Sequence, residues 1–177
     1  MKCLMNTKRI GRRSMSELTD PRQVILVTSR EEMDIMGKKE VKDNIITIAW
    51  HMPVSFNPNL YAISIGKTRF SCEIIKKSKA FAVNFVPFEL KKQVLVCGTK
   101  SGIHIDKFKE AGLTKEECKS IDCPRIKEAL AYIECEVINE VDAGDHIIFV
   151  GKVLNSEIKK NGKRLLQRGN DFVTTAV

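Results

Sequence analysis

The sequence predicts a mostly antiparallel β-barrel with short helices packed outside it. Strand-like segments dominate the pattern, they are unevenly spaced, and helical periodicity fills only two or three connections. No strand–helix–strand alternation runs through the chain, which argues against a doubly wound parallel sheet. A length of 177 residues, with 43% hydrophobic and 29% charged side chains, is typical of one globular domain.

The expected elements follow from apolar runs, their periods and the turn residues between them. A β-rich run after Pro21 opens the pattern, and a charged stretch with a lone Gly37 predicts a hairpin-like connection. Phe70 and Ile74 lie four residues apart, as on one helix face, and Ala143-Gly144 predicts a turn between two long strands. The expected strands are residues 24–29, 44–50, 60–65, 81–85, 131–140, 146–157 and 171–174, and the expected helices are 69–79, 90–96 and 107–111.

The net charge of +8 is concentrated at the start of the chain. Residues 1–14 carry five basic side chains and no acidic one, whereas the remainder is nearly balanced. This leader lacks the apolar stretch of a secretory signal, and Met15 offers a second start, so we expect 1–14 to be a disordered or non-native leader before a domain at 15–177. A nucleic-acid-binding module on this leader is the alternative, but no aromatic residues interleave with the charges. No apolar run is long enough to cross a membrane, and we expect a cytoplasmic protein.

Six cysteines raise the question of bridges or a metal site. No pair has the Cys-x-x-Cys spacing that zinc and iron–sulfur sites use, and the closest pair is Cys118 and Cys123. We therefore expect no metal and mostly buried, reduced thiols.

Three catalytic motifs fail on spacing. Gly66-Lys67-Thr68 resembles the end of a phosphate-binding P-loop, but Tyr61 stands where the first glycine should be. No Gly-x-Gly-x-x-Gly is present, and the residue types of a hydrolase triad, Ser101, His104 and Asp106, are crowded into six positions. These patterns exclude a P-loop nucleotide triphosphatase and disfavour a Rossmann domain and a hydrolase.

A phosphate site is predicted where a strand gives way to a helix. Thr68 is placed to cap the helix, and its free N–H groups would gather with Lys67, Arg69 and Ser71 around an anion. The alternative is an ordinary capped helix with solvated cations.

The strand at residues 44–50 combines polar groups with the only tryptophan. Asn44, Thr47 and the following His51 are unusual for a buried strand, and together with Trp50 they suit a flat heteroaromatic ligand. Core packing is the alternative explanation for Trp50.

A series of motifs in one order resembles the flavin reductase-like family, which has the FMN-binding split-barrel fold and includes the flavoredoxins. The likeness spans about residues 21–174, and each motif is short. The motifs are Pro21-Arg-Gln-Val-Ile-Leu-Val-Thr, Asn44 with Ala49-Trp50, Met52-Pro-Val-Ser-Phe56, Ile63-Ser-Ile-Gly-Lys67 with Arg69 and Ser71, Phe81-Ala-Val-Asn84, Val96-Cys-Gly-Thr99, Asp106-Lys-Phe108, Leu130-Ala-Tyr-Ile-Glu-Cys135 and Gly144-Asp-His146.

The resemblance implies FMN as the cofactor. Asn44 and Trp50 would line the isoalloxazine ring, Arg69 and Ser71 would hold the phosphate, and Lys107 would stabilise negative charge on the reduced ring. The C-terminal motif departs from the family at Gln167-Arg-Gly169, where relatives tend to show a histidine and paired glycines. The expected cofactor-binding residues are Asn44, Thr47, Ala49, Trp50, Lys67, Arg69, Ser71, Lys107, His146 and Phe172.

The function implied is that of an NADH- or NADPH-dependent flavin reductase that passes electrons through FMN to flavin, ferric iron or another acceptor. A flavoredoxin-type electron carrier reduced by a protein partner is the alternative. The fold also implies a homodimer, with His146 and Phe172 completing the pocket across its interface.

Overall fold

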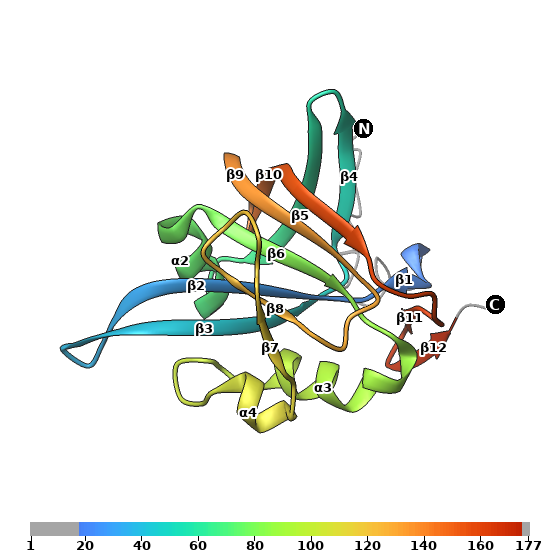
Figure 1. The fold of residues 1–177 in the computed structure, drawn as a ribbon, viewed down its shortest axis with the longest axis horizontal. Coiled ribbons are helices and arrows are strands. Elements are labelled where there is room, and N and C mark those ends of the chain that lie inside the picture. Colours follow the sequence, from blue (N-terminus) through green and yellow to red (C-terminus); the bar gives the residue numbers. More distant parts are fainter. Residues whose placement is uncertain (1–17, 175–177) are drawn as a thin grey trace, which may run out of the picture.

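Antiparallel strands make up most of the computed structural model, which describes residues 18–174 (Figure 1). The basic leader at 1–14 and Cys3 lie outside the described residues. The strands are β1 (Arg22–Gln23), β2 (Ile25–Ile35), β3 (Lys38–Ile48), β4 (His51–Phe56), β5 (Asn59–Gly66), β6 (Ala80–Phe85), β7 (Lys115–Glu117), β8 (Pro124–Ile126), β9 (Ala131–Ala143), β10 (His146–Ile158), β11 (Leu165–Arg168) and β12 (Asp171–Thr174). The helices are α2 (Phe70–Ser78), α3 (Lys91–Thr99) and α4 (Lys107–Ala111), with a single 3₁₀ turn at Phe88–Leu90.

The main sheet curls until its two edges meet. Its seven strands run in the order β3-β2-β6-β9-β10-β5-β4, and every pairing is antiparallel. The edge strands β3 and β4 are joined by only Ala49 and Trp50, so the chain steps directly from one edge to the other. The N–H of Ser64 on β5 donates to the carbonyl of Trp50 at 2.9 Å. The split β-barrel expected from the sequence is confirmed.

Two hydrophobic cores lie on opposite sides of β2. Ile25 and Val27 face the barrel interior with Phe81 and Phe149, whereas Leu26 packs against the layer formed by α3 and α4. Burial on both faces explains why this strand begins as an unbroken apolar run rather than an alternating one. Figure 1 shows α3 and α4 lying along the outside of the β2–β3 pair.

A second, small sheet is built from segments far apart in the sequence. Strands β1, β11 and β12 pair in the order β1-β11-β12, with Arg22 opposite Gln167. The side chain of His51 ties this sheet to the barrel, because its Nε2 donates to the carbonyl of Gln23 (3.0 Å) while its Nδ1 accepts from the hydroxyl of Tyr61 (2.6 Å). Burial lowers the pKa of His51, which keeps the ring neutral as this pattern requires.

Each expected strand and helix is present, with shifted ends. The main error concerns residues 31–43: both arms continue β2 and β3 in one long hairpin, and the connection is only the turn at Met36-Gly37, where φ is 55° and 81°. The charged side chains do not break these strands because the hairpin projects into solvent. The strand at 44–50 ends at Ile48, and the sequence prediction missed β1, β4, β7, β8 and β11.

Within residues 18–174, no helix is long and apolar enough to cross a membrane. That same part of the chain holds no group of three or more side chains of the metal-ligating types placed to share an ion.

Candidate functional site

A groove with a polar end and an aromatic end runs along the outside of the barrel where β3 meets α2. The polar end is lined by residues of β3, the start of α2 and the segment 97–102. The aromatic end is lined by residues of β1, β3, β5, β10 and β11. Ile46, Thr47 and Arg69 line both ends, which makes the two parts one continuous groove.

A buried amide marks the polar end. Asn44 is 1% exposed, and its Nδ2 donates to Oγ of Ser71, in the first turn of α2, at 2.7 Å. The other amide atom, Oδ1, is buried without a hydrogen-bond partner in the described structure. Gly102 lies against this atom: a Cβ at that position would stand 2.1 Å from Oδ1. The sequence therefore places an unsatisfied acceptor in the groove, and glycine leaves the room it needs.

The N-terminus of α2 opens onto the polar end, but Thr68 does not cap it. Arg69 occupies the N-cap position, and no side chain accepts a hydrogen bond from the first turn. The capping prediction for Thr68 is wrong because the helix begins one residue later than expected. The exposed side chain of Arg69 forms no ion pair or hydrogen bond with any described residue. An unpaired guanidinium and uncapped N–H groups together favour an anion.

Lys107 supplies a second, buried cation. Its side chain is 4% exposed, and Nζ donates to the carbonyls of Ile45 (2.6 Å) and Cys97 (2.7 Å). Burial, with a smaller contribution from the positive charge of Arg69, lowers the pKa of Lys107 to about 8. An ammonium has three N–H donors, so one remains after the two carbonyl bonds. No acidic side chain of the described residues lines this end of the groove.

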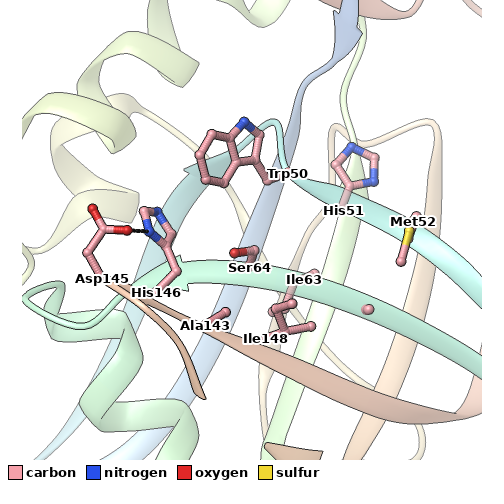
Figure 2. A pocket seen from close by; sticks show the side chains of 10 residues that line it. Trp50, His51, Met52, Ile63, Ser64, Ala143, Asp145, His146 and Ile148 are labelled. Atoms are coloured by element: carbon pink, nitrogen blue, oxygen red, sulfur yellow. Dashed lines mark hydrogen bonds and ion pairs between the residues drawn. The ribbon is translucent and has the colours of Figure 1, made fainter. Parts of the chain in front are cut away.

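Two rings lie next to each other at the aromatic end, with their planes tilted by 35°. The ring centroids of Trp50 and His146 lie 4.9 Å apart, and Nδ1 of His146 bonds the carboxylate of Asp145 at 2.7 Å. Figure 2 shows Trp50 and His146 near each other above the strands, with Ser64 on the strand below Trp50. Trp50 is 50% exposed, so core packing does not account for it.

An apolar cavity of about 410 Å³ adjoins this ring pair. Trp50, His146 and Ser64 belong to its lining as well as to the groove. The other lining residues, shown in Figure 2, come from β4, β5 and the β9–β10 hairpin. A ligand in the groove and a second molecule in this cavity would meet at the same two rings.

Arg22 and Gln167 line the aromatic end, and neither was predicted from the sequence to bind a cofactor. The Arg22 guanidinium pairs with Asp20 at 3.0 Å, and its Nε is buried without a hydrogen-bond partner. The two residues come together through the pairing of β1 with β11. They are separated by almost the whole chain, and no local spacing signals such a pairing.

The structure brings eight of the ten expected cofactor-binding residues to the groove and leaves two outside its lining. Lys67 points to the β9–β10 hairpin, where Nζ bonds the carboxylate of Asp142 at 2.7 Å. Phe172 packs against the hydrophobic core between the barrel and the helices. The groove residues are Asn44, Thr47, Arg69, Ser71 and Lys107 at the polar end and Ala49, Trp50 and His146 at the aromatic end, with Thr47 and Arg69 also lining the latter.

Comparison with known proteins identifies a protein family for this chain. The profile of the flavin reductase like domain matches residues 18–175. An uncharacterized protein of Archaeoglobus fulgidus is 39% identical over 125 residues, which are 69% of this chain and 71% of the relative. The next three curated relatives are matched over 52% to 63% of their own length.

Solved structures agree with this match. The flavin reductase PheA2 in its native state has a TM-score of 0.75 and 30% identity, covering 96% of this chain and 99% of the other. An FMN-binding protein from Thermus thermophilus with bound 1-cyclohex-2-enone has a TM-score of 0.78 and 25% identity, covering 90% and 89%.

Proposed function

The chain belongs to the flavin reductase-like domain family, and from this premise we propose that it is an FMN-dependent oxidoreductase that takes reducing equivalents from NADH or NADPH. The observation that carries the proposal is the groove, whose cationic end is continuous with the neighbouring rings of Trp50 and His146. Its two chemistries match a flavin mononucleotide, which has a phosphate at one end and a flat heteroaromatic ring at the other.

The polar end is the proposed place of the phosphate and the ribityl chain. Arg69, Ser71 and the first turn of α2 would bind the phosphate, and the buried ammonium of Lys107 would add a second positive charge. The unpartnered Oδ1 of Asn44 would accept a hydrogen bond from a ribityl hydroxyl, which would satisfy the buried atom. The residues present therefore fit the group.

The aromatic end is the proposed place of the isoalloxazine ring. Ala49 and Trp50 would contact the ring, Thr47 would line its approach, and Arg22 and Gln167 would meet its polar edge. When bound, FMN would supply the hydride-accepting and electron-donating chemistry, and the chain would bind and orient it. The apolar cavity beside Trp50 and His146 gives a nicotinamide or an acceptor a place to approach the ring.

We also propose a cytoplasmic homodimer. Support comes from apolar side chains exposed on the β4–β5 hairpin, where Met52 is 57% and Phe56 99% exposed. A partner covering this hairpin would also cover the adjoining cavity. The electron acceptor, whether free flavin, ferric iron or another molecule, would reach the ring through the opening that remains.

The experiment is a visible absorption spectrum of the purified protein, followed by anaerobic addition of NADH and then NADPH. A flavin band that bleaches on addition supports the reductase and identifies the donor. A band that persists with both nucleotides overturns the reductase and favours the flavoredoxin-type carrier. A colourless protein that does not quench the fluorescence of added FMN or FAD overturns flavin binding altogether.

A further inference from the structure

Cys118 and Cys123 face each other at the end of the β7–β8 hairpin, away from the flavin groove. The ladder pairs Lys115 with Ile126 and Glu117 with Pro124, and one further step in the same register pairs the two cysteines. The N–H of Cys118 donates to the carbonyl of Cys123 at 3.0 Å, which continues the ladder through this pair. Opposed residues of antiparallel strands have Cα atoms ~4.5–5.5 Å apart, and disulfides usually span Cα distances of ~4.4–6.8 Å.

The two thiols lie on the same face and within reach of each other. Glu116 and Arg125, the cross-strand pair two positions away on that face, join their side chains at 2.6 Å. Complete burial raises the pKa of the Cys123 thiol, and the neighbouring Cys118 thiol acts in the same direction. Both cysteines are free thiols in this structure.

The backbone on each side of the pair is held in place. The buried carboxylate of Glu134 accepts hydrogen bonds from the N–H groups of Lys119 (3.0 Å) and Ser120 (2.8 Å) in the loop between the cysteines. Arg30 bonds Glu117 and Asp122, the residues immediately before each cysteine, both at 2.8 Å. The hairpin is therefore fixed in the arrangement that a cross-link requires.

We propose that Cys118 and Cys123 are a reversible dithiol–disulfide pair that reacts by exchange with low-molecular-weight disulfides. Cys118 is partly exposed and Cys123 is buried, which assigns the first attack to Cys118. The Cys118 thiolate attacks one sulfur of the external disulfide, forms a mixed disulfide and releases one thiolate. Cys123 then attacks the Cys118 sulfur; its proton goes to the departing second thiolate. The two cysteines lose two electrons in total, and the external disulfide gains them as two thiols.

The test uses the whole chain, with Cys3→Ser as background so that this thiol, which lies outside the described residues, cannot compete. The protein is equilibrated with mixtures of oxidised and reduced glutathione, trapped with acid and a maleimide, digested and examined by mass spectrometry. We expect a peptide cross-link between Cys118 and Cys123 that disappears as reduced glutathione increases.

Two variants separate closure of the pair from simple exposure of one thiol. Cys123→Ser should leave Cys118 as a glutathione adduct, at least about tenfold more abundant than in the parent, because nothing displaces it. Cys72→Ser, which removes another buried thiol, should leave the cross-link unchanged, and circular dichroism checks that each variant is folded.

Equal glutathione adduct at Cys118 in the parent and in folded Cys123→Ser would overturn the proposal, and so would the absence of any cross-link in the parent protein. If Cys123→Ser does not fold, the parent protein alone tests the proposal: the cross-link must form in it and must disappear as reduced glutathione increases. None of these results depends on whether the groove binds a flavin.

Discussion

Replacing Lys107 by methionine tests the buried charge in the polar end of the groove. The pKa of Lys107 is about 8 in the folded chain, against the ordinary 10.5 of an exposed lysine. Between these two values the unfolded chain binds more protons than the folded chain, so the free energy of unfolding must rise with pH. Below pH 8 both states carry the charge, and the folded state bears the full cost of burying it.

The size of the effect follows from the shift. A difference of about 2.5 pKa units corresponds to at most about 3.4 kcal/mol. The folded chain escapes this cost as Lys107 loses its proton, and most of the change falls between pH 7 and about pH 9.5. Integrating the difference in bound protons between the unfolded and folded chains over this range gives an increase of about 2 kcal/mol in the free energy of unfolding. Lys107→Met keeps a side chain of similar shape and has no proton to lose. It also leaves the carbonyls of Ile45 and Cys97 unpaired, which costs about 1–3 kcal/mol each at every pH.

The informative quantity is therefore the change with pH, and not the difference at one pH. Urea unfolding of both proteins, followed by the fluorescence of Trp50, gives the free energy of unfolding at pH 7 and at about pH 9.5. We expect the parent to gain about 2 kcal/mol relative to the variant over this range. Groups distant from Lys107 are the same in both proteins, and the neighbouring Cys97 thiol, whose pKa burial raises to about 11, stays mostly protonated in the folded chain over this range. If the two proteins change in parallel, Lys107 is not a desolvated cation and the electrostatic description of the groove is wrong.

Three further outcomes are expected. Ser71→Ala combined with Arg69→Ala should weaken FMN binding about 10- to 100-fold and riboflavin binding much less, by fluorescence quenching, because only FMN carries the phosphate; equal losses for both ligands would contradict the phosphate assignment. Gly102→Ala should lower FMN affinity and also lower the melting temperature, because its Cβ would displace the buried Asn44 amide; unchanged affinity would remove Asn44 from the binding site. Light scattering should give a dimer mass that falls to that of a monomer in Phe56→Glu, whereas a monomer with bound FMN in the parent would exclude a shared pocket.

Local patterns were enough to place most elements of the fold. The helix at Lys107–Ala111 matches its expected bounds because Asp106 caps its start and Gly112, with φ of 64°, ends it. The β9–β10 turn is likewise fixed by its own residues, at Gly144. A hairpin-like connection at Gly37 was expected, but the length of the β2 and β3 strands was not, because charged side chains on both arms hide the strand pattern once the strands leave the core.

The groove residues likewise fall into those that local sequence patterns indicate and those that only the folded chain brings together. Arg69, Ser71 and Trp50 stand at the ends of elements, where unusual residue types attract attention. Arg22 and Gln167 enter only through a strand pairing between the two ends of the chain, and Lys107 becomes informative only when its burial is known. A sequence shows which groups are available, whereas long-range pairing and desolvation decide which of them lie together and with what charge.

The two-residue link between β3 and β4 makes barrel and groove one cooperative unit. Trp50 contributes its ring to the groove and its carbonyl to a hydrogen bond that extends the β4–β5 ladder by one step. Opening the groove at this point therefore means breaking the end of that ladder. The Ser64 amide proton should exchange with solvent deuterium as slowly as the slowest amides of the barrel interior, and a ligand in the groove should slow its exchange further without any direct contact to that amide.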